Sequence, residues 1–334
     1  MRLGGHLLLS AAVATHTAPP APVYLVATPI GNLGDITLRA VDTLRNADCI
    51  AAEDTRHTKK LLHHLQIQNK KQIQHHEHNL DRAIPKIIQL AKQGMSVAVV
   101  SDAGTPGISD PGAKLASECA ARGVPLVPVP GACAAITALS VSGFSCTDFR
   151  FAGFLPRVGK GRRLKLAELT AEPHAVVFYE SPQRILSTLQ DISAAGSGQR
   201  NCVCARELTK LHEEIERGSV SELASSLARR ADRGEEICGE FTVILGPLSA
   251  DELKQRNEEE LGDKQLAARQ LLVEMLHEGE SVSRAARSVA TQLGTSRSLV
   301  YPLALEVQEQ LGRGTRESPN KGDDAPNKDE DASF

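Results

Sequence analysis

Three loops rich in glycine and proline carry the residue types best suited to holding a small ligand. Residues 101–112 (SDAGTPGISDPG) directly follow an apolar run, and residues 28–35 (TPIGNLGD) and 129–134 (VPGACA) each follow another. Glycine has no Cβ atom, so residues such as Gly31 and Gly104 would let a ligand approach the backbone closely. None of the loops matches the phosphate-loop or dinucleotide fingerprint. We expect one ligand crevice, with tight turns as the simpler alternative for any single loop.

Six histidines fall between His57 and His78, and a metal site therefore has to be considered. Zinc takes about four convergent ligands, and no H-E-x-x-H or cysteine pattern accompanies these histidines. We expect no metal. The HHEHN segment, residues 75–79, is interpreted as a partly solvated loop near the ligand crevice.

A basic segment, residues 156–165 (PRVGKGRRLK), holds five cations around two glycines. We predict a flexible loop in which Arg157, Lys160, Arg162 and Arg163 attract phosphate groups, an attraction that is independent of base sequence and sensitive to salt. The alternative is a solubilising surface loop. With 3% aromatic residues and no tryptophan, no broad base-stacking surface is expected.

Apolar runs alternate with amphipathic stretches over residues 22–145, the predicted first domain. Buried parallel strands are predicted at residues 23–27, 49–52, 97–100 and 126–129. Helices are predicted at residues 38–44, 55–65, 83–92, 113–121 and 134–139. This alternation predicts an open parallel sheet covered by helices on both faces. The carboxyl ends of its strands would bring the three loops to one edge.

A second α/β domain is predicted over residues 146–250. Its strands are expected at residues 149–155, 175–179, 202–206 and 241–245, and its helices at 163–168, 183–192 and 220–227. We expect a mixed sheet. Cys202 and Cys204 lie two residues apart, so both should face one side of a strand.

Strand signals end after Pro247. Helical spacing at residues 264–277, 282–293 and 296–311 predicts a small helix-turn-helix-like domain over residues 261–312. Residues 313–334 lack periodicity and are predicted to be a disordered acidic tail. Residues 1–21 only loosely imitate a signal peptide and are expected to form a disordered extension.

The composition limits the partners of the chain. Its net charge is −3, of which the tail from Glu317 to Phe334 contributes −4, so the body is not strongly basic and nucleic acid would have to bind at local patches. The seven cysteines form no C-x-x-C pair, which favours reduced thiols and a cytoplasmic location. No apolar run reaches the roughly 18 residues of a membrane span.

Seven segments together carry a resemblance to a known family: VATPIGNLGDITLRA, AAEDTRHT, HHEHN, SDAGTPGISDPG, VPVPGACAA, FYESP and ARELTKLHEE. In this order, from about Tyr24 to Leu245, they resemble the ribosomal RNA small subunit methyltransferase I family, which is similar in fold to the tetrapyrrole methylases. The resemblance implies a two-domain tetrapyrrole-methylase-like fold with a C-terminal helical bundle. It further implies S-adenosylmethionine-dependent 2′-O-methylation of a cytidine in 16S ribosomal RNA by a cytoplasmic homodimer.

The resemblance implies that S-adenosylmethionine binds between the two α/β domains, mainly through the backbone of the three loops. Relatives often carry a hydroxyl residue where this chain has Cys133. The residues implied in cofactor binding are Pro29, Gly31, Asp102, Ala103, Gly104, Ile108, Cys133, Ala134, Phe178 and Tyr179.

A ribose 2′-hydroxyl is a poor nucleophile at neutral pH, so a nearby base would assist methyl transfer. Glu53, Asp54 and Glu180 are the candidates, and each has the alternative role of a helix-capping carboxylate. Further candidates for RNA phosphate contacts are Arg56, Arg184, Arg206 and Lys210. Two other functions stay open: a porphyrinoid methyltransferase of the same fold, and a non-catalytic nucleic-acid-binding protein acting through the C-terminal helices.

Overall fold

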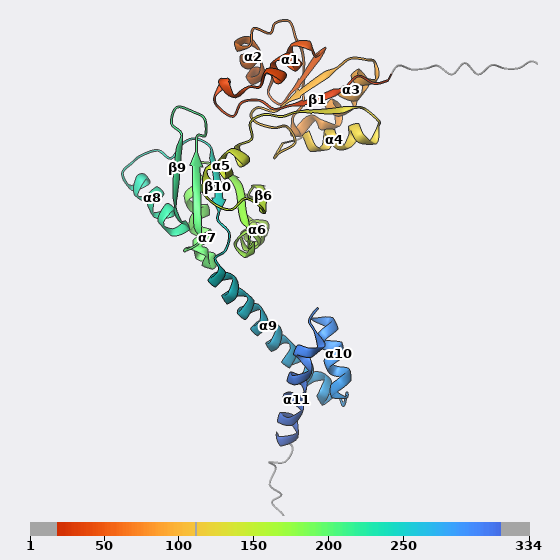
Figure 1. Ribbon diagram of the computed structural model, residues 1–334, viewed down its shortest axis with the longest axis vertical. Coiled ribbons are helices and arrows are strands. Elements are labelled where there is room, and N and C mark those ends of the chain that lie inside the picture. The colour runs from red at the N-terminus through yellow and green to blue at the C-terminus, as the bar shows by residue number, and fades with distance from the viewer. Residues whose placement is uncertain (1–18, 111, 315–334) are drawn as a thin grey trace, which may run out of the picture. The chain divides into compact units, whose positions relative to one another are not determined.

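The computed structural model describes residues 19–110 and 112–314 and divides the chain into two compact units, Met1–Leu248 and Ser249–Phe334 (Figure 1). The predicted disordered segments at residues 1–21 and 313–334 therefore lie almost entirely outside the described residues. Within the described residues, no helix is both long and apolar enough to cross a membrane.

The first half of unit 1 is an all-parallel five-stranded sheet with the order β3-β2-β4-β1-β5. Its strands are β1 (Val23–Val26), β2 (Cys49–Ala52), β3 (Lys71–Gln74), β4 (Val97–Val100) and β5 (Leu126–Val129). Its helices are α1 (Leu38–Asn46), α2 (Thr55–His64), α3 (Leu80–Lys92), α4 (Gly112–Ala121) and α5 (Ala134–Ser142), with the single turns η1 (Leu33–Asp35) and η2 (Glu77–Asn79).

The parallel sheet predicted from the apolar runs is confirmed, with helices on both faces. On one face Cys49, Ala51 and Val97 pack against α3 and α4; on the other, Ile50 and Val100 pack against α1 and α2. The sequence interpretation missed β3, because its four residues are mostly polar. β3 is an edge strand, which has one neighbour and so needs little apolar surface.

The second half of unit 1 is a mixed sheet, as predicted, and its strand order is β6-β7-β10-β8-β9, in which β9 was not foreseen. Only β6 and β7 run parallel, and the other neighbours are antiparallel. Its strands are β6 (Phe149–Phe154), β7 (Ala175–Glu180), β8 (Asn201–Arg206), β9 (Glu214–Ser219) and β10 (Phe241–Leu245). Its helices are α6 (Gly159–Ala171), α7 (Ile185–Ile192) and α8 (Val220–Asp232), with the short turn η3 (Ser193–Ser197).

One face of this second sheet is covered by its own helices and the other by α5. Cys202 and Cys204 both lie in the core under α6, α7 and α8, so the prediction that they share one face of a strand is confirmed. On the opposite face, Ala138 and Leu139 of α5 pack against Val177 of β7 and other strand residues. The helix that follows the third glycine loop therefore joins the two sheets.

The basic segment at residues 156–165 is not a flexible loop, and that prediction is wrong. Helix α6 begins at Gly159, four residues before the predicted start. Leu166, Leu169 and Thr170 recur at helical spacing and are buried against the second sheet, which explains why the chain is helical there. Only residues 156–158 remain outside regular structure.

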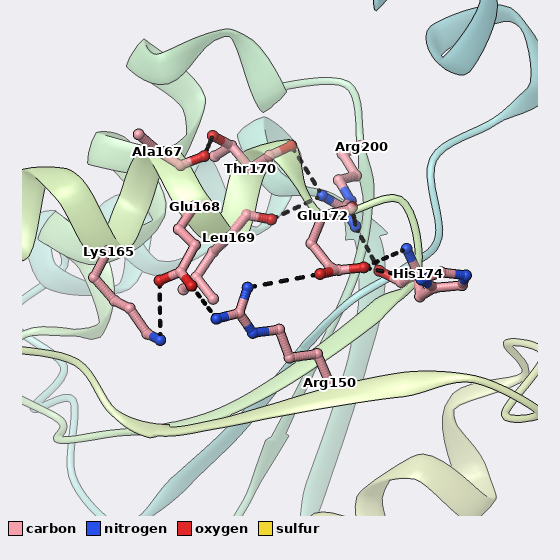
Figure 2. Close-up of polar contacts among 9 residues, drawn as sticks. All are labelled: Arg150, Lys165, Ala167, Glu168, Leu169, Thr170, Glu172, His174 and Arg200. Atoms are coloured by element: carbon pink, nitrogen blue, oxygen red, sulfur yellow. Dashed lines mark hydrogen bonds and ion pairs between the residues drawn. The ribbon is translucent and has the colours of Figure 1, made fainter. Parts of the chain in front are cut away.

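Arg200 is fully buried, 1% exposed, just before β8. Its guanidinium donates hydrogen bonds of 2.9–3.3 Å to the carbonyl oxygens of Leu169, Thr170, Glu172 and His174 (Figure 2). A fifth bond, of 2.6 Å, goes to the Gly246 carbonyl. The last carbonyl groups of a helix have no partner within it, and Arg200 supplies one to the end of α6. The same side chain ties α6 to the segment that leaves β10. No sequence pattern indicated this role.

Unit 2 consists of α9 (Ala250–His277), α10 (Val282–Gln292) and α11 (Arg297–Gly314) around an apolar core of its own. Helix α9 begins well before the predicted residue 264. Ser249 and Glu252 form a reciprocal capping box at its start, with bonds of 3.2 and 2.7 Å, a signal that the sequence interpretation overlooked. The predicted three-helix arrangement is otherwise present.

Replacing Arg200 with Met should lower the free energy of unfolding by about 3 kcal/mol or more, because five buried carbonyl groups lose a charged donor. Urea denaturation of the full chain followed by circular dichroism measures the change. Arg229→Met is the matched control on exposed surface of α8, and it should stay within about 0.5 kcal/mol of the parent. Equal effects of the two substitutions would contradict the role given to Arg200.

Candidate active site

The first and second glycine loops are joined by a pair of backbone hydrogen bonds. The Thr28 N–H donates to the Gly104 carbonyl at 2.9 Å, and the Gly104 N–H donates to the Thr28 carbonyl at 3.1 Å. Gly104 has φ of +82°, a conformation that residues with a Cβ atom rarely adopt. The loops follow β1 and β4, which are neighbours whose crossovers leave in opposite directions, and ligands of α/β sheets bind at such a switch point.

The third loop is attached to the other two. The Thr105 hydroxyl donates to the Ala132 carbonyl at 3.0 Å. Gly131 approaches Ala27 so closely that an added Cβ would lie 2.8 Å from the Ala27 Cβ. The convergence of three loops expected from the sequence is therefore present at the edge of the first sheet.

A cavity of about 480 Å³ lies where these loops meet the second sheet. This volume falls in the range of about 300–1,000 Å³ that is typical of small-molecule sites. The second loop forms one wall, and β7, β8 and β10 contribute the opposite wall through Tyr179, Ala205 and Thr242.

Seven of the ten predicted cofactor-binding residues line this cavity: Asp102, Ala103, Gly104, Ile108, Cys133, Ala134 and Tyr179. Pro29 and Gly31 do not. Gly31 instead lies against Lys210, whose Cγ would be 2.4 Å from an added Cβ. Phe178 is completely buried in the core on the other face of β7, because neighbouring residues of a strand point to opposite faces.

The three candidate bases have different surroundings. Glu53 lines the cavity, and burial, reinforced by Asp102 and Asp110, raises the pKa of its carboxyl group, although the Asp102 N–H donates to it at 3.3 Å. Asp54 does not line the cavity. It caps α2 by accepting from the Arg56 N–H at 2.8 Å, and its contacts with Arg56 lower its pKa strongly.

Glu180 lines the cavity, but its carboxylate already has three donors. It accepts hydrogen bonds from the Ser181 N–H and the Thr188 hydroxyl, both at 2.8 Å, and pairs with Arg184 at 2.6 Å. The side chain is fully buried. Of the three candidate bases, Glu53 therefore has the fewest hydrogen-bond and ion-pair partners, and its pKa is raised toward neutral pH.

The HHEHN segment is partly solvated as predicted, but its first residue, His75, is only 2% exposed. It follows β3, and its N–H donates to the Ala52 carbonyl at 2.7 Å. Burial lowers the pKa of the imidazole, which favours its neutral form. Glu77 and His78 are exposed. Among the described residues, no three His, Cys, Asp or Glu side chains converge as metal ligands do.

The predicted RNA-binding cations fall into two groups. Four of them are less than one third exposed and form ion pairs of 2.6–3.1 Å: Arg162 with Asp191, Arg184 with Glu180, Arg206 with Glu214, and Lys210 with Glu207 and Glu240. Arg56 is 87% exposed and pairs with Asp54 at 2.7 Å. Arg157, Lys160 and Arg163 are exposed and form no ion pair within the described part of the chain.

Comparison with known proteins gives consistent matches. Residues 22–224 match the family of tetrapyrrole (corrin/porphyrin) methylases. Ribosomal RNA small subunit methyltransferase I of Synechocystis is 39% identical over 286 residues, which cover 86% of this chain and 98% of that protein. The protein of the same name from Vibrio cholerae is 42% identical over 287 residues, covering 86% of this chain and 95% of that one.

Among solved structures, a cobalt precorrin-4 methyltransferase of cobalamin biosynthesis is similar in fold. The match covers 67% of this chain and 94% of that chain, with a TM-score of 0.51 and 17% sequence identity. At this identity the likeness concerns the fold alone.

Replacing Glu53 with Gln should stabilise the protein at neutral pH. The folded state binds the Glu53 proton more tightly than the unfolded state does, so the parent loses stability as pH rises from the ordinary carboxyl pKa through the raised one. The amide of the Glu53→Gln variant carries no charge and avoids that loss. In melting curves recorded between pH 4 and pH 8, the variant should have the higher melting temperature at pH values above the raised pKa. This difference should vanish at the acidic end of the range.

The control for this melting series is Glu77→Gln, since the Glu77 side chain is exposed. A Glu53→Gln variant whose melting temperature follows that of the parent at every pH would show that the carboxyl group is not perturbed by folding.

Proposed function

The chain belongs to the tetrapyrrole methylase family and, within it, to the ribosomal RNA small subunit methyltransferase I proteins, and from this premise we propose that it transfers the methyl group of S-adenosylmethionine to a cytidine 2′-oxygen of small-subunit ribosomal RNA. The relatives from Synechocystis and Vibrio cholerae are covered over 98% and 95% of their own length, so the proposal concerns the whole activity of these proteins. Seven free cysteines support a reducing compartment, and we place the enzyme in the cytoplasm.

The charge of the cavity is the observation that carries this proposal. Five acids line it, namely Glu53, Asp102, Asp110, Glu180 and Glu240, and its lining includes no lysine, arginine or histidine. S-adenosylmethionine carries a sulfonium and an ammonium group against one carboxylate, so it suits an acidic cavity. Small residues such as Ala103, Gly104 and Ala134 leave backbone groups accessible for its remaining polar atoms.

The same charge argues against a porphyrinoid acceptor. Arg184 pairs with Glu180 and Lys210 with Glu240, but no cation among the described residues pairs with the other three acids, and a macrocycle that bears several carboxylates would have to approach them. The reacting nucleoside of an RNA has an uncharged base and sugar, and its phosphates can stay at the rim. Arg157, Lys160 and Arg163, which are exposed and outside ion pairs, suit those phosphates.

Catalysis requires little more than alignment and removal of one proton. When bound, S-adenosylmethionine supplies a methyl group already activated by its sulfonium leaving group. The three joined loops hold the cofactor side of the site rigid, which favours alignment of the hydroxyl with the methyl group. Glu53 accepts the 2′-hydroxyl proton on a carboxylate oxygen, and its raised pKa brings it closer to the operating pH.

A homodimer is part of the proposal on the resemblance alone, and sedimentation velocity tests it. The competing non-catalytic function, nucleic-acid binding through α10 and α11, leaves the acidic cavity unexplained. Transfer of label from the cofactor to purified small ribosomal subunits separates the possibilities when tetrapyrroles and acceptor-free reactions are run beside it. Label on subunits alone is expected; label on tetrapyrroles, or on nothing, would overturn the proposal.

Gly104→Val should weaken S-adenosylmethionine binding more than tenfold, about 1.4 kcal/mol, because a β-branched residue is strained at φ of +82° and would disturb the bonds to Thr28. Isothermal titration calorimetry measures the affinity. Gly123→Val is matched, since Gly123 also has positive φ and an added Cβ would meet nothing within 4 Å. Equal losses in both variants would assign the effect to general destabilisation.

Removing Lys160 and Arg163 together by alanine substitution should weaken RNA binding and reduce its salt slope by about one to two, since each phosphate contact in single-stranded RNA adds about 0.7. Cofactor affinity should not change. Arg162→Ala is the control because Arg162 pairs with Asp191 and bonds Thr188, so it should lower the melting temperature and leave the slope unchanged. Identical slopes for all three proteins would remove α6 from the RNA-binding surface.

A further inference from the structure

Strand β6 contains a β-bulge at the edge of the cavity. Its register against β7 runs from Phe151 opposite Val177 directly to Gly153 opposite Phe178, so Ala152 is an extra residue. Gly153 has φ of +63°, which glycine adopts without strain. Bulges of this kind redirect the side chains that follow them.

The bulge decides which way Phe154 points. Phe154 lies opposite Tyr179, on the face of the sheet that lines the cavity. With a regular register, Phe154 would lie one residue further along β7, on the face that carries Phe178 and the apolar core. Because of one extra residue, the ring is instead 59% exposed at the cavity.

The exposed ring is supported from behind. Tyr179 packs against Phe154 with ring centroids 5.4 Å apart, and Phe151 meets Tyr179 edge-on at 5.2 Å. The Tyr179 hydroxyl accepts a hydrogen bond from the Ala135 N–H at 3.3 Å, which fixes the middle ring. Phe154 is thus a rigidly backed aromatic surface. The other aromatic residues of the cavity lining, Tyr179 and Phe241, are at least half buried.

We propose that Phe154 is the stacking platform for the base of the target nucleotide. The inference rests on the proposed function, because a ribose inside a folded RNA reaches a cavity only when its nucleotide leaves the stack. Proteins receive such unstacked bases on aromatic side chains. Exposing the apolar ring of Phe154 does not stabilise the fold. A strand without the extra residue would have placed the ring in the neighbouring apolar core.

The cations that follow Phe154 agree with this assignment. Arg157, Lys160 and Arg163 come within nine residues of it, all exposed and free of ion pairs among the residues described. The base would stack on the ring while its flanking phosphates meet these side chains. Asp102 and Asp110, two cavity acids without an ion-pair partner among the described residues, remain available to the cationic cofactor.

Steady-state methylation of small subunits by the full-length enzyme tests the proposal with three substitutions. Phe154→Ala should raise the KM for RNA about tenfold or more, the size of one lost base stack, while cofactor affinity measured by calorimetry stays within about twofold. Phe154→Tyr keeps an aromatic face and should retain the parental KM. Phe154→Leu keeps apolar bulk without a π face and should behave like the alanine variant.

Phe149→Ala is the control, because Phe149 begins the same strand, is 39% exposed and does not line the cavity. It should leave the KM unchanged. Melting temperatures of all variants identify any that fail to fold, in which case the tyrosine and leucine pair decides.

Several results would overturn the assignment. Cofactor affinity that falls with the KM would place the ring on the cofactor, and altered sedimentation of Phe154→Ala would place it at a contact between copies of the chain. A leucine variant with parental KM would show that only apolar volume matters. If the parent enzyme labels no subunits, the proposed function is wrong, and the proposed stacking role of Phe154 is wrong with it. If the parent is active and the Phe154 variants keep its KM, only the stacking role is wrong.

Discussion

The paired backbone hydrogen bonds between Thr28 and Gly104 are the constraint on which the cavity depends. They hold together the loops of β1 and β4, the two central strands whose crossovers diverge. Divergence opens a space at the sheet edge, and without a link the two loops would be free to separate. The link needs a residue at positive φ, which Gly104 supplies. The hydrogen bond from the Thr105 hydroxyl to the Ala132 carbonyl attaches the third loop to these two.

Helix α5 connects the first sheet to the second. The third loop leads into this helix, whose residues Ala138 and Leu139 are buried against the second sheet. The cavity walls are therefore positioned by one continuous path of backbone bonds and apolar packing. The second sheet has its own anchor in Arg200, which ends α6 and holds the chain leaving β10. The Thr28–Gly104 hydrogen bonds and the Arg200 side chain both satisfy backbone polar groups that would otherwise be buried without partners.

The acidic cavity lining contrasts with the exposed cations Arg157, Lys160 and Arg163, which follow β6 in the chain and form no ion pair among the described residues. Arginines and lysines next to buried carboxylates are held in ion pairs, as Arg184 is with Glu180, and they orient those carboxylates. Lys160 and Arg163 of α6 are exposed and form no ion pair among the described residues, so they remain for an external anion. Because the same helix follows the bulge that exposes Phe154, the geometry associates the aromatic ring and the cations on one stretch of chain.

The sequence by itself determined the parallel sheet, the mixed sheet, the three converging loops and the C-terminal helices, because buried strands and helix faces leave apolar periodicity in the chain. It did not reveal β3 and β9, which are edge strands with mostly polar or charged residues. Only the tertiary structure decided that Phe178 is core and Phe154 is exposed, that Asp54 caps a helix while Glu53 lines the cavity, and which cations are paired. Each of these features depends on a strand register, a bulge or a partner distant in sequence, such as Asp191 for Arg162. Local sequence patterns do not predict such contacts, because both partners are needed to define them.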